Sequence, residues 1–210
     1  MIQERLKELR AQMQERGIDI YIVPTSDFHQ SEYVGEYFKA RKYMTGFTGS
    51  AGTAVITKEE AGLWTDGRYF IQAEKQLEGS TVKLFKMGEE GVPKVEEYVK
   101  DHLTEGSCIG FDGRVMDAKS GEKYAKMAEE KKAALYVKED LVGNIWKDRP
   151  QLPANKVWIL EDAYAGRSMA DKIADVRTKM QKEGADIHIL SSLYDIAWLL
   201  NLRGGDIDHV

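Results

Sequence analysis

Polar and aromatic side chains that could bind a ligand are most concentrated in residues 63–70, LWTDGRYF. The pattern predicts a strand followed directly by a helix. An arginine at such a junction can make a charge-assisted contact with an anionic group. A structural interpretation is favoured from the chemistry alone: Asp66 caps the helix, Trp64 packs in the core, and Arg68 is solvated.

Metal-assisted hydrolysis needs several His, Asp or Glu side chains that converge on one or two ions. The histidines, His29, His102, His188 and His209, are scattered, and no HExxH spacing occurs. Neither a Gly-x-Ser-x-Gly elbow nor a Walker loop is present. The sequence therefore offers no catalytic or metal-ligating set, and His188 is expected on the polar side of a strand end.

Residues 46–52, GFTGSAG, are the most glycine-dense segment of the chain. A phosphate-binding loop follows a strand and carries a lysine, whereas this segment precedes an expected strand and has none. We therefore expect these glycines to adopt positive φ angles or to allow close packing.

The composition indicates an ordinary globular protein, with 42% hydrophobic and 31% charged residues and a net charge of −5. The two signs of charge are interspersed, so neither nucleic acid nor anionic lipid is an expected partner. The single cysteine, Cys108, excludes an intrachain disulfide and is expected to be a buried apolar residue. No secretory or membrane-spanning apolar run occurs, which predicts a cytoplasmic location.

The amino-terminal elements predict an α/β fold with a mixed sheet. Leu6, Leu9 and Met13 share one face of a helix that Gly17 can end. The run 18–23, IDIYIV, is typical of a strand buried on both faces. Residues 53–57 and 62–65 flank a polar turn and predict an antiparallel hairpin.

The remaining expected elements lead to a domain boundary. Further strands are predicted over 81–86 and 108–111, with helices over 67–77, 93–103 and 118–132 and Pro93 in a first helical turn. Residues 147–155 hold two of the four prolines and few apolar residues, as in a stiff linker. We therefore predict a first domain over 1–146 and a second over 156–210.

The second part of the chain repeats the first. It predicts a strand over 157–160, a helix over 168–183 and a buried strand over 187–190. A shift of 167 positions aligns Arg10 with Arg177, Met13 with Met180, Gln14 with Gln181, Gly17 with Gly184, Asp19 with Asp186, Ile20 with Ile187 and Ile22 with Ile189. Convergence of two amphipathic units stays open, but domain duplication is favoured because polar residues match as well.

The repeat predicts that the second domain is incomplete. Its first copy continues for about 150 residues, whereas the second has about 50 residues after the linker. A final helix rich in Leu193, Trp198 and Leu199 would need a sheet to cover it. We therefore expect a fragment of a longer protein.

Five motifs in order along the chain carry a resemblance to a known family. They span residues 27–33, 43–52, 64–70, 145–150 and 195–204. Through them the whole chain resembles the creatinase/prolidase N-terminal region of cytosolic, three-domain Xaa-Pro aminopeptidases of the M24 metallopeptidase family. The resemblance implies two similar α/β domains of RNase H-like topology and a third, pita-bread catalytic domain that this chain lacks.

The resemblance also implies an activity for the full-length protein. Such enzymes remove the residue that precedes proline from peptides, use two divalent metal ions, usually manganese, and form homodimers. Their metal ligands match no position here, so no catalytic or metal residue is assigned. The implied role of this region is to shape access to an active site and to support dimerisation. Arg41, Trp64, Asp66 and Arg68 are the candidate access or interface residues.

Two alternatives stay open at this point. Relatives of this architecture that lost their metal ligands imply a peptide- or histone-binding module without catalysis. Proline dipeptidases and creatinases are less similar because they have a single amino-terminal domain. The presence or absence of metal ligands in the longer protein separates the first alternative from an aminopeptidase.

Overall fold

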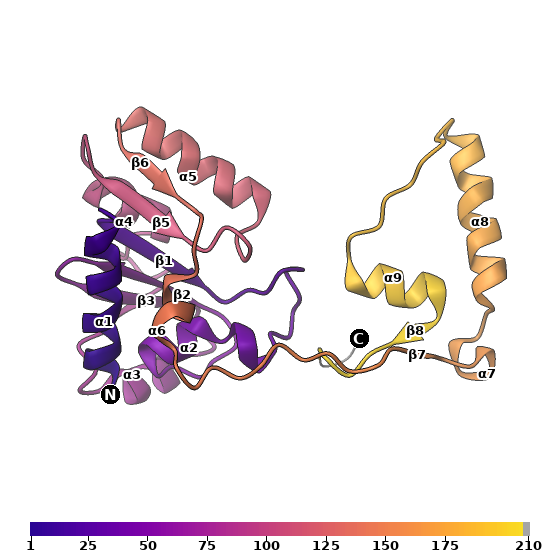
Figure 1. The fold of residues 1–210 in the computed structure, drawn as a ribbon, viewed down its shortest axis with the longest axis horizontal. Helices are drawn as coiled ribbons and strands as arrows, with labels where there is room; N and C mark the ends of the chain where they lie inside the picture. The colour runs from indigo at the N-terminus through magenta and orange to yellow at the C-terminus, as the bar shows by residue number, and fades with distance from the viewer. Residues whose placement is uncertain (208–210) are drawn as a thin grey trace. The chain divides into compact units, whose positions relative to one another are not determined.

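A computed structural model of the chain describes residues 1–207 and divides into two compact units (Figure 1). Unit 1 comprises Met1–Gln30 and Glu36–Gln151, and unit 2 comprises Ser31–Gly35 and the residues from Leu152 onward. His209 and the last residues of the predicted second domain, 156–210, lie outside the described part. The predicted domains and the linker over 147–155 stay predictions, because compactness alone does not define folding units.

Unit 1 is built on one mixed sheet of six strands. The strands are β1 (Ile20–Pro24), β2 (Thr53–Thr57), β3 (Ala61–Thr65), β4 (Lys83–Lys86), β5 (Cys108–Phe111) and β6 (Ala134–Tyr136). Their order across the sheet is β4-β3-β2-β1-β5-β6, and β2 runs antiparallel to both of its neighbours. The other pairings are parallel. The predicted α/β fold with a mixed sheet is confirmed, as is the hairpin of β2 and β3.

Helices pack on both faces of this sheet (Figure 1). They are α1 (Ile2–Glu15), the 3₁₀ turn η1 (Glu36–Phe38), α2 (Ala40–Thr45), α3 (Phe70–Leu77), α4 (Val95–His102), α5 (Ala118–Glu130) and α6 (Leu141–Ile145). Along β1, Tyr21 and Val23 join the apolar cluster with α1, α2, α3 and α6. Ile20 and Ile22 join the opposite cluster, with α4 and α5. Strand β1 is therefore buried on both faces, as its continuous apolar run predicts.

Two local predictions in unit 1 are wrong. Helix α3 starts at Phe70, and its preceding cap residue is Tyr69, so Asp66 does not cap a helix. The Asp66 carboxylate instead accepts a hydrogen bond from the backbone N–H of Arg68, which keeps this segment in a turn. Helix α4 starts two residues after Pro93, whose carbonyl accepts a hydrogen bond from the indole of Trp64.

Unit 2 contains three helices and one short two-stranded sheet in its described part. They are β7 (Trp158–Ile159), α7 (Asp162–Ala165), α8 (Met169–Lys182), α9 (Leu193–Leu200) and β8 (Leu202–Arg203), with β7 antiparallel to β8. The predicted strand over 187–190 is wrong: these residues are irregular, with Ile187 79% and Ile189 83% exposed. Within residues 1–207 no strand pairs with them, and an unpaired strand lacks the hydrogen bonds that hold it extended.

The repeated helix is reproduced in the structure. Helix α8 begins and ends 167 positions after α1, and the glycines that follow have φ angles of 67° at Gly17 and 65° at Gly184. Beyond the first glycine, the Ile18 N–H donates to the Met13 carbonyl at 2.8 Å. The same bond joins Ala185 to Met180 at 2.9 Å. The helix and its glycine stop are therefore confirmed as a repeat.

Candidate functional site

The candidate residues of unit 1 are brought together by the direction of the strands. Strands β1, β3 and β5 all point the same way, so the segments that follow them lie at one edge of the sheet. Strand β2 runs the other way and starts at this edge, with Thr53 opposite Pro24. The glycine-rich segment before β2 and the turn after β3 therefore share an edge, which we call the carboxyl-terminal edge. Ligands of open α/β sheets bind preferentially at such edges.

Arg41 lies beneath this edge with its side chain buried, only 4% of the residue being exposed. Its Nε donates to the Thr25 hydroxyl at 2.9 Å, and its Nη1 and Nη2 donate to the carbonyls of Phe47, at 2.5 Å, and Gly49. All three acceptors are neutral, and burial lowers the pKa of Arg41 to about 10. The guanidinium thus holds the glycine-rich segment in place from below.

The glycine-rich segment packs closely against its neighbours on several sides. A Cβ atom on Gly49 would lie 2.2 Å from the Phe47 ring. A Cβ atom on Gly52, whose φ is 153°, would lie 2.8 Å from the Trp64 carbonyl. The Thr25 hydroxyl donates to the Gly52 carbonyl at 2.7 Å. The expectation that these glycines allow close packing is confirmed.

Trp64 is fully buried in the cluster beneath β3. Its ring stacks on Phe85 with 3.9 Å between centroids, and Tyr98 meets it edge-on. Its indole N–H donates to the Pro93 carbonyl at 2.8 Å, so its polar atom is satisfied. The interpretation of Trp64 as a core residue is confirmed.

Asp66 and Arg68 form a rigid charged turn at the surface. Arg68 donates from Nε to Asp66 Oδ1 at 2.8 Å and from Nη2 to Oδ2 at 2.9 Å. The Arg68 side chain is 69% exposed, and this bidentate contact lowers the pKa of Asp66 and raises that of Arg68. Beside them the hydroxyls of Tyr69 and Ser50 are 2.6 Å apart. Of the four candidate residues, only Asp66 and Arg68 have side chains that a ligand could reach.

A second turn of the same construction follows β5. In Asp112-Gly113-Arg114, the arginine donates from Nε to Oδ1 at 3.0 Å and from Nη2 to Oδ2 at 2.9 Å. Its backbone N–H also donates to Oδ1, as in Asp66-Gly67-Arg68. We did not predict this turn, although the repeated Asp-Gly-Arg after a strand was a visible signal. The carboxyl-terminal edge therefore carries two fixed guanidinium groups.

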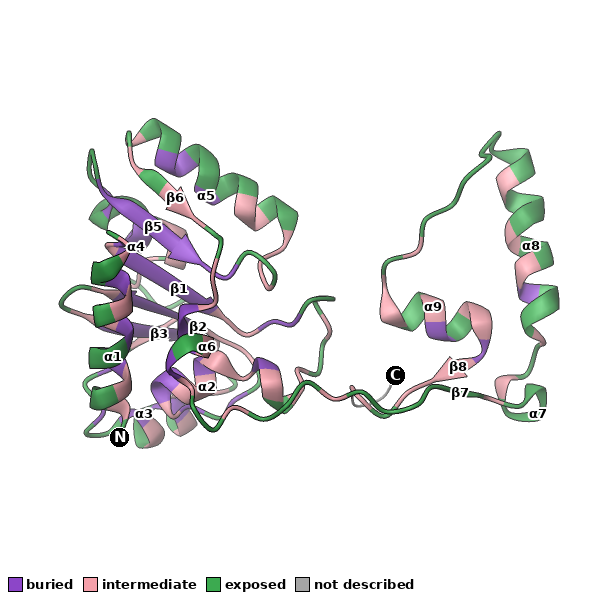
Figure 2. Cartoon of the chain, viewed as in Figure 1, coloured by how far each residue is buried: buried purple, intermediate pink, exposed green. Residues whose placement is uncertain are grey.

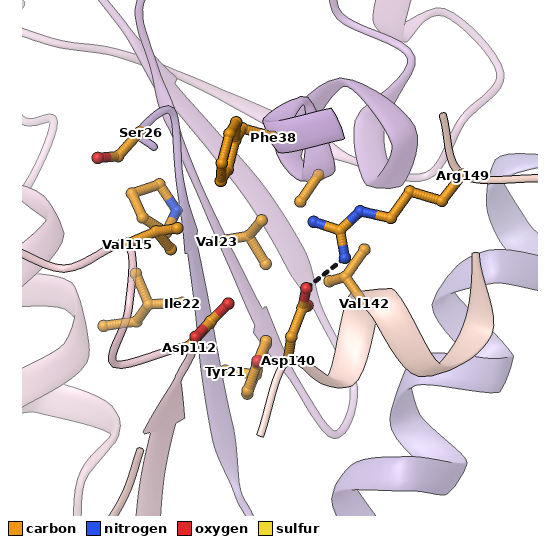
Figure 3. A pocket seen from close by; sticks show the side chains of 12 residues that line it. Tyr21, Ile22, Val23, Ser26, Phe38, Asp112, Val115, Asp140, Val142 and Arg149 are labelled. Atoms are coloured by element: carbon orange, nitrogen blue, oxygen red, sulfur yellow. Dashed lines mark hydrogen bonds and ion pairs between the residues drawn. The ribbon is translucent and has the colours of Figure 1, made fainter. Parts of the chain in front are cut away.

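A small cavity lies between the second turn and helix α6 (Figure 3). Asp140 on its wall accepts a hydrogen bond from Arg149 Nη1 at 2.5 Å, and Arg149 lies over the Tyr37 ring at 3.8 Å. The cavity has a volume of about 20 Å³, which is room for a single water molecule. A peptide residue cannot enter a space of this size.

The described residues do not fit a metal centre. Within residues 1–207 no group of three or more His, Cys, Asp or Glu side chains converges on a point that could hold an ion. A two-metal hydrolytic site needs several such side chains around its ions. In the same part of the chain, no helix combines the length and the apolar character needed to cross a bilayer.

Comparison with known families decides the identity of the fold. Residues 5–138 match the creatinase/prolidase N-terminal domain, and residues 148–210 match a second form of the same domain. The chain belongs to the creatinase/prolidase N-terminal domain family. This creatinase/prolidase N-terminal chain thus continues, after its first domain, into a second segment of the same kind.

Relatives of this creatinase/prolidase N-terminal chain are much longer than it is. It is 42% identical over 214 residues to aminopeptidase P2 of Arabidopsis thaliana, covering 100% of this chain and 30% of the relative. It is 45% identical over 210 residues to a probable Xaa-Pro aminopeptidase P of Pyrenophora teres f. teres, covering 98% and 31%. The chain therefore spans about a third of the length of the relatives it matches.

A solved structure has the same fold over nearly the whole chain. This is the X-prolyl aminopeptidase of Caenorhabditis elegans, described as a cytosolic enzyme with a di-nuclear active site. The TM-score is 0.89 and the identity 34%, over 99% of this chain and 35% of that one. The described part of this creatinase/prolidase N-terminal chain thus corresponds to about a third of an aminopeptidase.

Proposed function

We propose that this chain is the amino-terminal, non-catalytic region of an Xaa-Pro aminopeptidase P. The observation that carries the proposal is similarity along the whole chain to proteins named as such, at 42% and 45% identity. The chain matches only about a third of those relatives. Catalysis is therefore assigned to the part of the protein outside this region.

In the longer protein, the substrate is a peptide with proline at its second position. The proline nitrogen carries no hydrogen and its ring fixes φ, which defeats the strand-like docking used by ordinary peptidases. Two divalent ions, manganese by this proposal, would supply the activated water there. The described residues do not hold them. A cytosolic location and a homodimer complete the proposal, in line with the description of the nematode relative as cytosolic.

The proposed role of unit 1 is to shape access to the active site through its carboxyl-terminal edge. Arg68 is the residue suited to meet a substrate or a partner subunit, because its guanidinium is fixed by Asp66 and open to solvent. Arg41 and Trp64 would act indirectly, since both are buried. Their hydrogen bonds and packing keep the glycine-rich segment and β3 in position beside Arg68.

The access role predicts an effect on catalysis in the longer enzyme. Arg68→Ala should lower kcat/KM for Xaa-Pro peptides about tenfold to a hundredfold, the range expected when a charge-assisted contact is lost. The test measures one short and one long peptide at verified metal content, so that gating of entry can be told from local binding. Arg114→Ala is the matched control, because it breaks the same kind of Asp-Gly-Arg turn. Unchanged kcat/KM in Arg68→Ala would leave unit 1 as scaffold and dimer contact.

If catalysis resides outside this region, the 210-residue chain alone should be inactive. It should show no manganese-dependent hydrolysis of an Arg-Pro-Pro peptide and no stoichiometric divalent metal after dialysis, because its described residues offer no ligand cluster. Metal analysis and a peptide cleavage assay on the purified chain decide this. Turnover that increases with added manganese would contradict the proposed assignment.

A further inference from the structure

A second set of hydrogen-bond donors lies at the edge of the sheet opposite the candidate site. Strand β2 ends at this edge with Thr57, which lies opposite Ile20 at the start of β1. We call it the amino-terminal edge, because β1, β3 and β5 begin there. It is separated from the carboxyl-terminal edge by the length of β1, five residues or about 15 Å. A small molecule bound at one edge would therefore not touch the other.

An open cavity of about 380 Å³ lies at the amino-terminal edge. Its lining residues are Arg10, Met13 and Gln14 of α1 and Lys58 of the turn between β2 and β3. Helix α1 buries one face and exposes the other (Figure 2), and Met13 lies on the buried face and Gln14 on the exposed one. Ligand pockets of proteins measure about 300–1,000 Å³. The cavity therefore has room for a small organic molecule.

Arg10 has donors at this cavity that the chain does not use. Its Nε donates to the Thr57 carbonyl at 2.9 Å, which fixes the guanidinium beside the end of β2. Within residues 1–207, neither Nη atom of Arg10 donates a hydrogen bond and no carboxylate pairs with it. A guanidinium binds a carboxylate or a phosphate through two parallel N–H groups of this kind. The unused edge of Arg10 therefore matches an anionic group.

The surroundings of Arg10 favour the binding of an anion. Burial lowers the pKa of Arg10, whereas the pKa of Arg16 on the same helix is raised, chiefly by its hydrogen bond to Glu139. A partly buried cation attracts an anion more strongly than a fully solvated one, because water screens the attraction less. An anion at Arg10 would therefore supply the partner that Glu139 supplies to Arg16.

Lys58 is a second cation that is held at the cavity. Its ammonium pairs with Asp19 Oδ1, and the backbone N–H of Cys108 donates to Asp19 Oδ2 at 2.7 Å. The Lys58 side chain is 66% exposed and its ammonium has three N–H donors, so donors beyond the contact with Asp19 can reach a ligand. Arg10, Lys58 and Asp19 together carry one excess positive charge. The cavity thus combines a net positive charge with donors that are held in place before a ligand binds.

We propose that the amino-terminal edge of unit 1 is a binding site for a small organic anion that carries a carboxylate or a phosphate group. Two oxygen atoms of this group accept hydrogen bonds from the two Nη atoms of Arg10, and Lys58 donates to one of them. The side-chain amide of Gln14 binds a polar substituent of the same molecule. The bound anion joins α1 to the turn between β2 and β3, so it stabilises unit 1. This site does not depend on the proposed peptidase function.

The test titrates the isotope-labelled 210-residue chain with succinate and, separately, with glycerol 3-phosphate at constant ionic strength. Nuclear magnetic resonance should show saturable shifts of the Arg10 Nε–H, the Gln14 side-chain amide and the Lys58 backbone amide, with a dissociation constant below about 10 mM. Saturation by either probe supports the site, and the tighter probe identifies the anionic group. At ten times the dissociation constant, the melting temperature of unit 1 should rise by about 3–5 °C.

Substitutions show whether the anion binds at this cavity. Lys58→Ala and Arg10→Lys should each weaken binding about three- to tenfold, the second because an ammonium lacks the planar fork of a guanidinium. Lys75→Ala, the same substitution at an exposed lysine of α3, should leave the affinity unchanged. Shifts that increase linearly with concentration for both probes, an unaltered affinity in either cavity variant, or an equal loss in Lys75→Ala would overturn the proposal. Such a failure would leave the proposed peptidase function standing, because that function is measured on Xaa-Pro peptides in the longer enzyme.

Discussion

Arg41→Ala should lower the free energy of unfolding of unit 1 by about 3 kcal/mol. The substitution removes the donors to the buried carbonyls of Phe47 and Gly49, and each unsatisfied buried partner costs about 1–3 kcal/mol. The bond to the part-buried Thr25 hydroxyl is lost as well. Removal of a buried cation offsets part of this cost. Urea unfolding, with hydrogen exchange of β1, β2 and β3 to isolate unit 1, measures the change.

The matched control for Arg41 is Arg68→Ala, the same substitution at an exposed arginine of the same edge. It should leave the stability of unit 1 almost unchanged. Arg41→Lys is the informative intermediate, because an ammonium lacks the planar fork that reaches all three acceptors. If Arg41→Ala unfolds at the same urea concentration as the original chain, the proposed support of the glycine-rich segment is wrong.

Trp64→Ala should destabilise unit 1 by about 3–5 kcal/mol, the usual cost of removing a fully buried large aromatic side chain. The loss includes the stacking on Phe85 and the hydrogen bond from the indole to Pro93. In the longer enzyme, kcat/KM of the fraction that stays folded should be unchanged at low temperature. Thermal and urea unfolding measure the stability, and the peptide assay measures the activity.

Two variants separate packing from hydrogen bonding at Trp64. Trp64→Phe keeps a ring but leaves the Pro93 carbonyl without its donor, so it should cost less than the alanine substitution. Trp158→Ala removes a half-exposed tryptophan of unit 2 and should leave the stability of unit 1 unchanged. A drop in kcat/KM of folded, metal-loaded Trp64→Ala would instead show that the packing of this residue affects substrate access as well as stability.

Much of the fold could be predicted because the signals are local. The stripe of Leu6, Leu9 and Met13 predicts the face of α1 that is buried, and Gly17 predicts its end. The hairpin β2–β3 follows from two β-rich runs around a polar turn. The local apolar pattern over 187–190 predicted a strand that does not form. A strand needs hydrogen-bonded partners, and these lie far away in the sequence.

The role of the candidate residues as a site stays a prediction, and their burial could not be predicted because it depends on packing. By residue type, Arg41 and Arg68 are the same. The structure buries the first beneath two carbonyls and leaves the second at the surface. Arg114 was missed, although it lies in the same Asp-Gly-Arg pattern as Arg68.

The sequence by itself determined the α/β class, the repeated helix with its glycine stop, and the motifs that place the chain in its family. These depend on periodicity and residue type within about one helix or strand. Only the tertiary structure decided that β5 pairs in parallel with β1, which brings two Asp-Gly-Arg turns to the edge where Arg41 supports the glycine-rich segment. Such pairings join residues far apart in the chain, and their free energy comes from burial and hydrogen bonds that form only when the sheet is assembled.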